Sequence, residues 1–480
     1  MDDSTKRSGV RVLMLPWLAH GHITPFLELA KKLADRNFHI YYCSAPVNLI
    51  SLKPKLSDSK YSNSIQLVEL HLPSFPELPP QYHTTKGLPP HLMPVLEKAS
   101  NMSRPNVTNI IETLKPDLVM YDYHARWVPE VASSLNIAAV SFMTSGVAEM
   151  SFFHHYYTSK RDADDEFPFP ELLTDYMRNK FSQMKISIAY SNSNERNEKG
   201  TSYEVSYQSH TSYDVSYQSH TSYEVSYQSH SSSKIMFVKT FREIEGKYMD
   251  YYFHSSGVKI VPVGPLVSDQ SVQEDEGKEI IDWLDDKDES STVFVSFGSE
   301  CYLSKEGMEE IAHGLELSNV NFIWVVRFPE GEKMKLEEAL PDGFLEKVRG
   351  RGLVVENWAP QVKILKHSSI GGFVSHCGWN SVVESMKFGV PIIAIPIQYD
   401  QPWNARVVVL SGVGLEVKRD VHNWKFGREN VAKVIKQVVV EKIGDDVRRK
   451  AKEMSDNIKA KAEEEMDEVE KEILHVCGIL

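Results

Sequence analysis

The 480-residue sequence has few cysteines, fewer basic than acidic residues, and no long apolar run. Its four cysteines, Cys43, Cys301, Cys377 and Cys477, show neither CxxC spacing nor the density of a disulfide framework, which predicts free thiols in a reducing compartment. A net charge of −13 argues against nucleic acid or an anionic membrane as the main partner. No stretch reaches the roughly 18 apolar residues of a membrane span, and the polar N-terminus lacks a signal-like apolar region. We therefore expect a cytoplasmic protein with no transmembrane segment and no nucleic-acid partner.

The length and the apolar pattern predict an α/β protein with two domains. A chain of 480 residues exceeds what one compact core normally holds. Short apolar runs alternate with segments of helical period, which is typical of parallel, doubly wound sheets. The expected strands are 10–15, 39–43, 118–121, 138–142 and 235–238 in the first half, and 292–297, 322–326, 353–355, 372–375 and 392–395 in the second. We therefore predict two Rossmann-like domains that face a cleft.

Composition suggests where these domains meet. We place an N-terminal domain at 1–255, an acidic linker containing Gly and Pro at 256–277, and a C-terminal domain at 278–455. The last segment, 456–480, is strongly charged but carries one apolar stripe, so we expect a helix that packs back on the N-terminal domain. We expect the protein to be a monomer.

One insertion, at 191–233, breaks the α/β pattern. Residues 201–230 are three copies of a ten-residue unit, TSYEVSYQSH or TSYDVSYQSH, with almost no aliphatic content. Three such units are too short for a stable solenoid, so we expect a mobile, low-complexity surface segment rather than an ordered hairpin. The recurring histidines at 210, 220 and 230 are a weak metal-site candidate, because nothing fixes their geometry.

A histidine follows the first predicted strand, in the motif LPWLAHGHITPF. Thr24 is typical of a helix N-cap and Pro25 of the first helical position, which places His22 just ahead of a helix. The carboxyl edge of a strand is where α/β sites form, and an imidazole there can take a proton from a hydroxyl. His20, in the same turn, is a second candidate.

A base of this kind needs a carboxylate that orients the imidazole and stabilises its charged form. Asp122 ends the predicted strand in PDLVMYDY and lies at the appropriate edge. Asp117 is the rival, but it precedes the same strand and lies at its opposite end.

The most informative stretch is 358–401, WAPQVKILKHSSIGGFVSHCGWNSVVESMKFGVPIIAIPIQYDQ. In it, the strand GGFVS leads through the turn HCGWN into the helix SVVESMKF. Unpaired backbone N–H groups and the dipole at that helix N-terminus favour a diphosphate. His376, Asn380 and Ser381 gather there and can add donors.

Other side chains of this stretch suit the remaining parts of a nucleotide sugar. Glu384 lies one helical turn after Asn380, where a carboxylate can accept hydrogen bonds from ribose hydroxyls. Trp358 can stack on a base. Asp400 and Gln401 follow an apolar run, at a strand end expected to face the cleft. Each has an ordinary structural explanation, but their joint spacing favours a nucleotide-sugar site.

This stretch resembles the signature of the plant family 1 UDP-glycosyltransferases, which have the GT-B fold. The similarity extends over nearly the whole chain apart from the tyrosine–serine repeat. The donor-binding residues that it implies are Thr144, Ser299, Trp358, Ala359, Gln361, His376, Gly378, Trp379, Asn380, Ser381, Glu384, Asp400 and Gln401.

The resemblance also implies what these residues do. Trp358 stacks on uracil with Gln361 near the uridine, Glu384 holds the ribose, and His376, Asn380, Ser381 and Ser299 bind the diphosphate. Trp379, Asp400, Gln401 and Thr144 reach the sugar. A glutamine at the end of the box is similar to members that use UDP-glucose, although users of UDP-xylose and UDP-glucuronic acid carry related boxes.

The match to the family's GHxxP pattern implies that His22 is the base and Asp122 its partner. The expected reaction inverts the anomeric carbon and needs no metal and no cofactor besides the UDP-sugar co-substrate. The openings WLAHGHITPFLELAKKL and STVFVSFGSE resemble the branch-forming members. These add a sugar to a sugar already present on a triterpene, flavonoid, lignan or apocarotenoid glycoside.

Three alternatives remain open at this point. The first is a glucosyltransferase that acts on the bare aglycone. A non-enzymatic nucleotide-sugar sensor would keep the box but have no need of His22 and Asp122. A nicotinamide dehydrogenase is expected to show GxGxxG after the first strand, where this chain reads LPWLAHGH.

Overall fold

A computed structural model describes residues 9–57, 59–158, 166–178, 234–267, 276–328, 335–420 and 423–480. The repeat at 201–230, and with it the whole insertion expected at 191–233, lies outside the described residues. Within the described ranges, no helix combines the length and the apolar character that crossing a bilayer demands.

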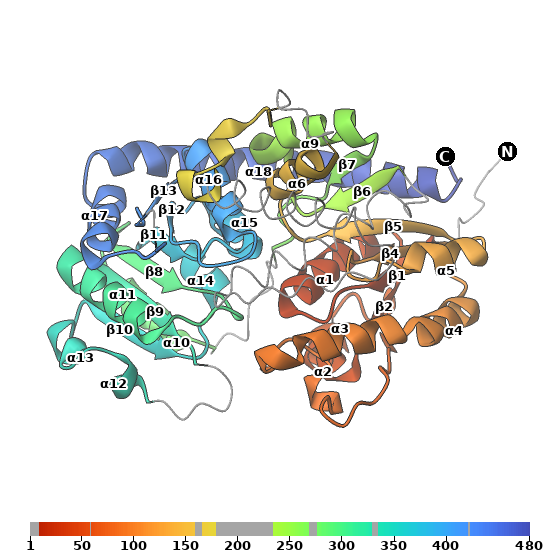
Figure 1. The fold of residues 1–480 in the computed structure, drawn as a ribbon, viewed down its shortest axis with the longest axis horizontal. Helices are drawn as coiled ribbons and strands as arrows, with labels where there is room; N and C mark the ends of the chain where they lie inside the picture. Colours follow the sequence, from red (N-terminus) through yellow and green to blue (C-terminus); the bar gives the residue numbers. More distant parts are fainter. Residues whose placement is uncertain are drawn as a thin grey trace, which may run out of the picture.

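Two parallel sheets lie side by side in the molecule (Figure 1). The first has the order β3-β2-β1-β4-β5-β6-β7 and the second β10-β9-β8-β11-β12-β13. Strands of the first are β1 (Arg11–Leu15), β2 (His39–Ser44), β3 (Ile65–Glu69), β4 (Leu118–Tyr121), β5 (Ala138–Met143), β6 (Ile235–Val238) and β7 (Lys259–Pro262). Strands of the second are β8 (Thr292–Ser296), β9 (Asn321–Val326), β10 (Gly352–Glu356), β11 (Ile370–Ser375), β12 (Ile392–Ala394) and β13 (Gly414–Glu416). The α/β prediction is confirmed.

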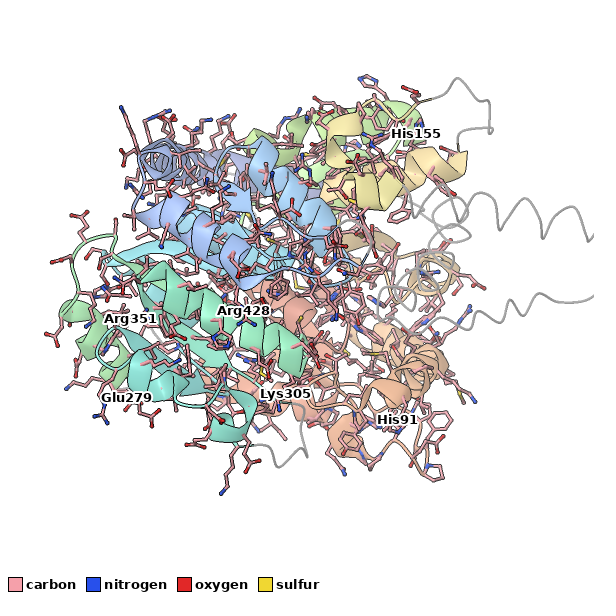
Figure 2. The ribbon with its side chains drawn as sticks, turned by 60° about the vertical axis from the view of Figure 1, so that its left-hand side comes forward. His91, His155, Glu279, Lys305, Arg351 and Arg428 are labelled. Atoms are coloured by element: carbon pink, nitrogen blue, oxygen red, sulfur yellow. The ribbon has the colours of Figure 1, made fainter. Side chains whose placement is uncertain are left out.

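Helices connect the strands. Those of the first half are α1 (His20–Ala34), α2 (Pro46–Ser57), α3 (Met93–Met102), α4 (Arg104–Leu114), α5 (Val128–Ser134), α6 (Val147–Thr158) and α9 (Arg242–Ser256). Those of the second are α10 (Lys278–Asp285), α11 (Lys305–Ser318), α12 (Leu336–Ala339), α13 (Phe344–Lys347), α14 (Gln361–Lys366), α15 (Trp379–Phe388), α16 (Gln401–Leu410), α17 (Arg428–Val439) and α18 (Ile443–Val476). Arg428 begins α17 beside α11, where its backbone N–H and guanidinium both bind the Glu310 carboxylate (Figure 2).

Both faces of each sheet are buried. Along β1, Val12 and Met14 belong to one hydrophobic cluster and Leu13 and Leu15 to another, because successive side chains of a strand point to opposite faces. Strands buried on both faces read as continuous apolar runs, which is why most of them could be recognised in the sequence.

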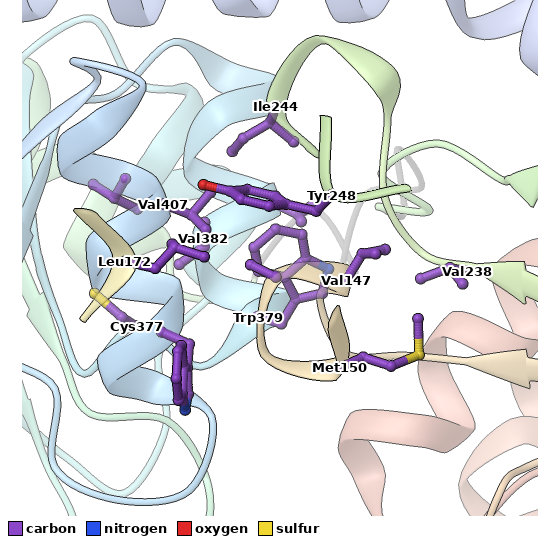
Figure 3. Close-up of a cluster of buried hydrophobic side chains, with 14 of the residues drawn as sticks. Val147, Met150, Leu172, Val238, Ile244, Tyr248, Cys377, Trp379, Val382 and Val407 are labelled. Atoms are coloured by element: carbon purple, nitrogen blue, oxygen red, sulfur yellow. The ribbon is translucent and has the colours of Figure 1, made fainter. Parts of the chain in front are cut away.

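A further hydrophobic cluster joins the two halves (Figure 3). Val147 of α6 and Tyr248 of α9 pack in it with Trp379 and Val382 of α15 and Val407 of α16. The N-terminus of α15 is thereby held against the first sheet's domain.

The long helix α18 contacts both halves of the molecule (Figure 1). Its Ala451 and Ile458 belong to the cluster between the halves, whereas Met466, Val469 and Ile473 are buried in the core of the first sheet. It is continuous from Ile443 to Val476, so no break separates the expected terminal helix from what precedes it.

Three strands escaped the sequence analysis: β3, β7 and β13. β7 is the edge strand of the first sheet, so this sheet extends past residue 255, where we ended the N-terminal domain, into the segment that we expected to be linker. A short run that ends in Pro262 resembles a linker, although proline is tolerated at the end of an edge strand.

Candidate active site

His22 and Asp122 meet at the carboxyl edge of the first sheet. β1 and β4 are parallel and in register, with Leu15 opposite Tyr121, and the Asp122 N–H donates to the Leu15 carbonyl at 2.9 Å. The residues after both strands therefore emerge together. His22 Nδ1 lies 2.6 Å from Asp122 Oδ2, and the Asp122 side chain is completely buried. The sequence-predicted pair is adjacent in the structure.

The helix that carries His22 begins earlier than we predicted. α1 starts at His20, with Ala19 as its N-cap, so Thr24 is not the cap and Pro25 lies inside the helix. Pro25 has no N–H to give the Gly21 carbonyl one turn before it. The Asn380 side chain supplies that bond instead, with Nδ2 donating to the Gly21 oxygen at 2.9 Å. The expectation was wrong because a contact from the other half of the molecule satisfies the carbonyl that proline leaves free.

A second imidazole, which the sequence analysis missed, shares the Asp122 carboxylate. His124 Nδ1 lies 2.8 Å from Asp122 Oδ1, and its ring stacks on Trp17 with centroids 4.5 Å apart. An ionised carboxylate only accepts, so both imidazoles donate to it through Nδ1–H. This tautomer leaves Nε2 of His22 as the proton acceptor.

His22, Asp122 and His124 are also close enough together to suggest a metal site. However, the nitrogen–oxygen distances of 2.6 and 2.8 Å are those of direct hydrogen bonds. The Nδ1 protons occupy the positions where a cation would have to bind. The geometry is that of an oriented base rather than of a metal centre.

Charge around the pair favours a protonated His22. Burial lowers the pKa of His22, but Asp122 and the more distant Glu300 and Asp400 outweigh this, so its pKa lies above the ordinary value. Burial raises the pKa of Asp122, and the two imidazoles more than reverse this, so its pKa is well below normal. Burial lowers the pKa of His124. The carboxylate therefore stays ionised and stabilises His22 once it has taken a proton.

The two rival residues lie elsewhere. Asp117 binds the backbone N–H and the guanidinium of Arg11 at 2.8 and 3.0 Å, at the opposite end of the strands. His20 is exposed and lies 3.3 Å from the Thr24 hydroxyl.

Thr144 follows β5, the next strand of the same sheet, and its hydroxyl lies 3.1 Å from His22 Nδ1. It is buried beside the base. The structure thus brings Thr144 together with His22 and Asp122.

The turn before α15 is shaped around His376. A Cβ atom at Gly378 would lie 2.6 Å from His376 Nε2, and one at Gly298 would lie 2.7 Å from the same ring. A larger residue at either position would force the imidazole to move. Burial, with Arg327 nearby, lowers the pKa of His376 to about 4, and its buried Nδ1 has no hydrogen-bond partner among the described residues. A neutral imidazole with an unused nitrogen suits an anionic ligand that accepts a hydrogen bond.

The residues expected around the uridine lie on two adjoining helices and the loop before them. Trp358 follows β10 and is 46% exposed, so its ring is available for stacking, while Ala359 is buried. Gln361 begins α14, and its Nε2 donates to Glu384 Oε2 at 2.6 Å. Burial raises the pKa of Glu384, against the opposing effects of Lys239 and Gln361.

At the N-terminus of α15, each of the three first residues has a distinct position. Trp379 is buried, and its indole N–H donates to the Lys239 carbonyl at 2.6 Å, so its ring belongs to the core. Asn380 reaches across to Gly21, and Ser381 is buried in the first turn.

Asp400 and Gln401 lie at the start of α16. Gln401 Oε1 accepts from the Ile397 and Gln398 N–H groups at 2.8 and 2.9 Å, which leaves its amide nitrogen to donate. Burial raises the pKa of Asp400 to about 6. Burial and Asp400 together raise the pKa of Glu149, another acid that the sequence analysis did not single out. Ser299 is exposed in the loop after β8.

Comparison with known proteins agrees with this arrangement. Residues 260–449 match the family model described as UDP-glucoronosyl and UDP-glucosyl transferase, and residues 8–201 match a glycosyltransferase N-terminal domain. Mogroside IIIx synthase from Siraitia grosvenorii is 52% identical over 98% of this chain and 94% of its own. Beta-D-glucosyl crocetin beta-1,6-glucosyltransferase from Gardenia jasminoides is 48% identical over 95% and 96%.

A more distant relative, cyanidin-3-O-glucoside 2-O-glucuronosyltransferase from Bellis perennis, is 42% identical over 97% of both chains. The crystal structure of a Glycyrrhiza uralensis UGT complexed with glycyrrhetinic acid 3-O-monoglucuronide superposes with a TM-score of 0.77 at 23% identity, covering 98% and 96% of the two chains. This establishes the GT-B fold with its two facing Rossmann-like domains. The chain therefore belongs to the plant family 1 UDP-glycosyltransferases, enzymes that take a sugar from a UDP-sugar donor.

Proposed function

We propose that this enzyme transfers glucose from UDP-glucose to a sugar hydroxyl of a small-molecule glycoside, with inversion at the anomeric carbon. The observation that carries the proposal is the Asp122–His22 pair, whose free Nε2 is a base for a hydroxyl, beside the N-terminus of α15. The relative named beta-D-glucosyl crocetin beta-1,6-glucosyltransferase supports the acceptor class, because the match covers nearly the whole chain.

The reaction follows from the groups present. His22 Nε2 takes the proton of the acceptor hydroxyl, whose oxygen then bonds to the anomeric carbon. The bond from that carbon to the diphosphate oxygen breaks on the opposite face, and UDP leaves. The charge that develops on the diphosphate is stabilised by the N-terminus of α15 and by His376. Asp122 stabilises the imidazolium that forms at His22.

The donor assignment rests on the start of α16. Gln401 presents an amide N–H, since its oxygen is occupied, and Asp400 presents a carboxylate. Both suit the hydroxyls of a neutral hexose, because an amide N–H donates to a hydroxyl oxygen and a carboxyl oxygen accepts from a hydroxyl. The uridine is assigned to Trp358, Gln361 and Glu384.

We propose a cytoplasmic location for this reaction.

A matrix of donors and acceptors tests this proposal. Purified enzyme is incubated with UDP-glucose, UDP-xylose or UDP-glucuronic acid, and with each aglycone and its monoglucoside, and products are identified by mass spectrometry. We expect addition of a hexose to the monoglucosides with UDP-glucose. A product formed on aglycones alone would overturn the acceptor assignment, and faster transfer from UDP-glucuronic acid would overturn the donor assignment.

A further inference from the structure

Lys239, directly after β6, is a buried charge that the proposed mechanism does not use. Its side chain is 2% exposed. Lysine is rarely buried unless its ammonium has a partner, because desolvation penalises the charge. The partner here is in the other half of the molecule: Nζ donates to Asn380 Oδ1 at the N-terminus of α15. The backbone carbonyl of Lys239 also accepts from the Trp379 indole, so both ends of the residue are tied to the same helix start.

This contact fixes which way the Asn380 amide faces. An ammonium only donates, so the amide oxygen has to face Lys239 and the amide nitrogen is turned toward Gly21. There Nδ2 donates to the carbonyl that Pro25 leaves without a helical partner. Lys239, Asn380 and Gly21 thus form a continuous chain from the first sheet, through the first turn of α15, to the residue before His22.

The electrostatics of this chain call for an anion. The N-terminus of α15 carries the positive end of the helix dipole, and Lys239 places a positive charge against it. Among the described residues, no carboxylate forms an ion pair with Lys239. The charges that act on it at longer range are Glu384 and Lys387 of α15 and Glu28 of α1. The positive end of the α15 dipole and the Lys239 ammonium repel each other. Their proximity becomes favourable once an anionic group lies between or beside them.

The ammonium remains largely charged at neutral pH. Burial lowers the pKa of Lys239 to about 8, against the upward effects of Glu384 and Glu28. An ammonium has three N–H groups, and Asn380 Oδ1 accepts from one of them. Phosphate oxygens can accept from the others. His376 Nδ1, in the turn before α15, is buried with no partner in the described part of the chain and points to the same class of ligand.

We propose that Lys239 is a positioning residue of the donor site: it holds the Asn380 amide in place and sets a positive charge behind the helix start that receives the diphosphate. The proposal rests on a UDP-sugar as donor and is independent of the acceptor. It predicts that Lys239 contributes to binding of the diphosphate and makes no contribution to binding of the uridine alone.

The test compares Lys239→Met with Lys239→Arg, and UDP with uridine, by isothermal titration calorimetry. We expect Lys239→Met to weaken UDP binding by about tenfold, the size of effect expected from loss of one charge-assisted hydrogen bond. Uridine binding stays unchanged, and Lys239→Arg retains UDP affinity. Lys452→Met removes an equal charge from an exposed position on α18 and controls for net charge.

A pH series tests whether the charge of Lys239 is what strengthens UDP binding. Between pH 7 and 9.5 the wild type loses its Lys239 charge and UDP affinity falls, whereas in Lys239→Arg it falls less because arginine stays protonated. The proposal would be overturned if Lys239→Met lost UDP and uridine binding equally, or if its UDP binding were unchanged. Melting temperatures show whether the variants fold. If the wild type binds UDP but transfers no glucose, the proposed function fails and this inference stands.

Discussion

At the scale of single residues, Asp122 organises the reactive edge of the first sheet. It is fully buried and accepts from both His22 and His124. Stacking on Trp17 fixes the His124 ring, and this ring binds one oxygen of the Asp122 carboxylate. The other oxygen therefore stays directed toward His22. The sequence predicted His22 and Asp122 because each follows a predicted strand and because LAHGHITP matches the family's GHxxP pattern. It could not predict His124, because a histidine two residues after an aspartate has no distinctive spacing.

The charge of Asp122 predicts a specific pH dependence. His22 acts as a base only when neutral, so kcat/KM rises as pH increases through its pKa, which Asp122 holds above 6.5. Asp122→Asn removes the negative charge, so this rise moves to lower pH, and it also lowers kcat by about 1,000-fold or more. Initial rates between pH 5 and 9 measure both effects. A rise at unchanged pH in Asp122→Asn would show that this carboxylate does not set the pKa of His22.

At the scale of secondary structure, what could be predicted depended on burial. β4 and β6 were predicted at their observed bounds, since they are short apolar runs covered on both faces. β3, with the sequence IQLVE, is partly exposed, and β13 has only three residues, so neither gives a clear period. The start of α1 was misplaced because the partner of the Gly21 carbonyl, Asn380, is 359 residues away. Local patterns cannot contain such a contact.

The turn before α15 predicts a sharp effect of a single methyl group. In Gly378→Ala, the added Cβ would come within 2.6 Å of His376 Nε2, so the imidazole has to move from the helix start. We expect weaker UDP binding, by about tenfold, from loss of one or two charge-assisted hydrogen bonds. Calorimetric titration with UDP measures this. Gly246→Ala is the control for added volume, since the nearest atom to its Cβ position lies at 3.8 Å, an ordinary contact. Equal affinities in both variants would contradict the close fit around His376.

At the scale of the whole molecule, the two halves are joined by side chains far apart in sequence. The cluster around Trp379 combines residues of both halves, and α18 continues from this cluster into the core of the first sheet. The apolar stripe of α18 could be seen in the sequence. Its depth could not be seen, because the surrounding charged residues indicate a surface helix, whereas Glu472, one of them, is buried and pairs with Lys259.

The role of α18 predicts a loss of stability from its last turns. Ile473 is completely buried, so Ile473→Ala leaves a cavity that costs about 2–5 kcal/mol. Leu480, which is 63% exposed, provides the matched control, and Leu480→Ala should change stability little. Thermal unfolding followed by circular dichroism compares the two. Similar melting temperatures for both variants would mean that the end of α18 contributes little to the fold.

The central claim is that His22 is the base that activates the acceptor hydroxyl beside a bound UDP-sugar. The most direct measurement is the rate of glucose transfer by His22→Ala at saturating UDP-glucose and monoglucoside, together with its affinity for UDP. Loss of a general base lowers the rate by about 100- to 10,000-fold, while UDP affinity stays that of the wild type, because His22 itself is not among the groups assigned to the uridine or the diphosphate. Turnover equal to that of the wild type would contradict the account.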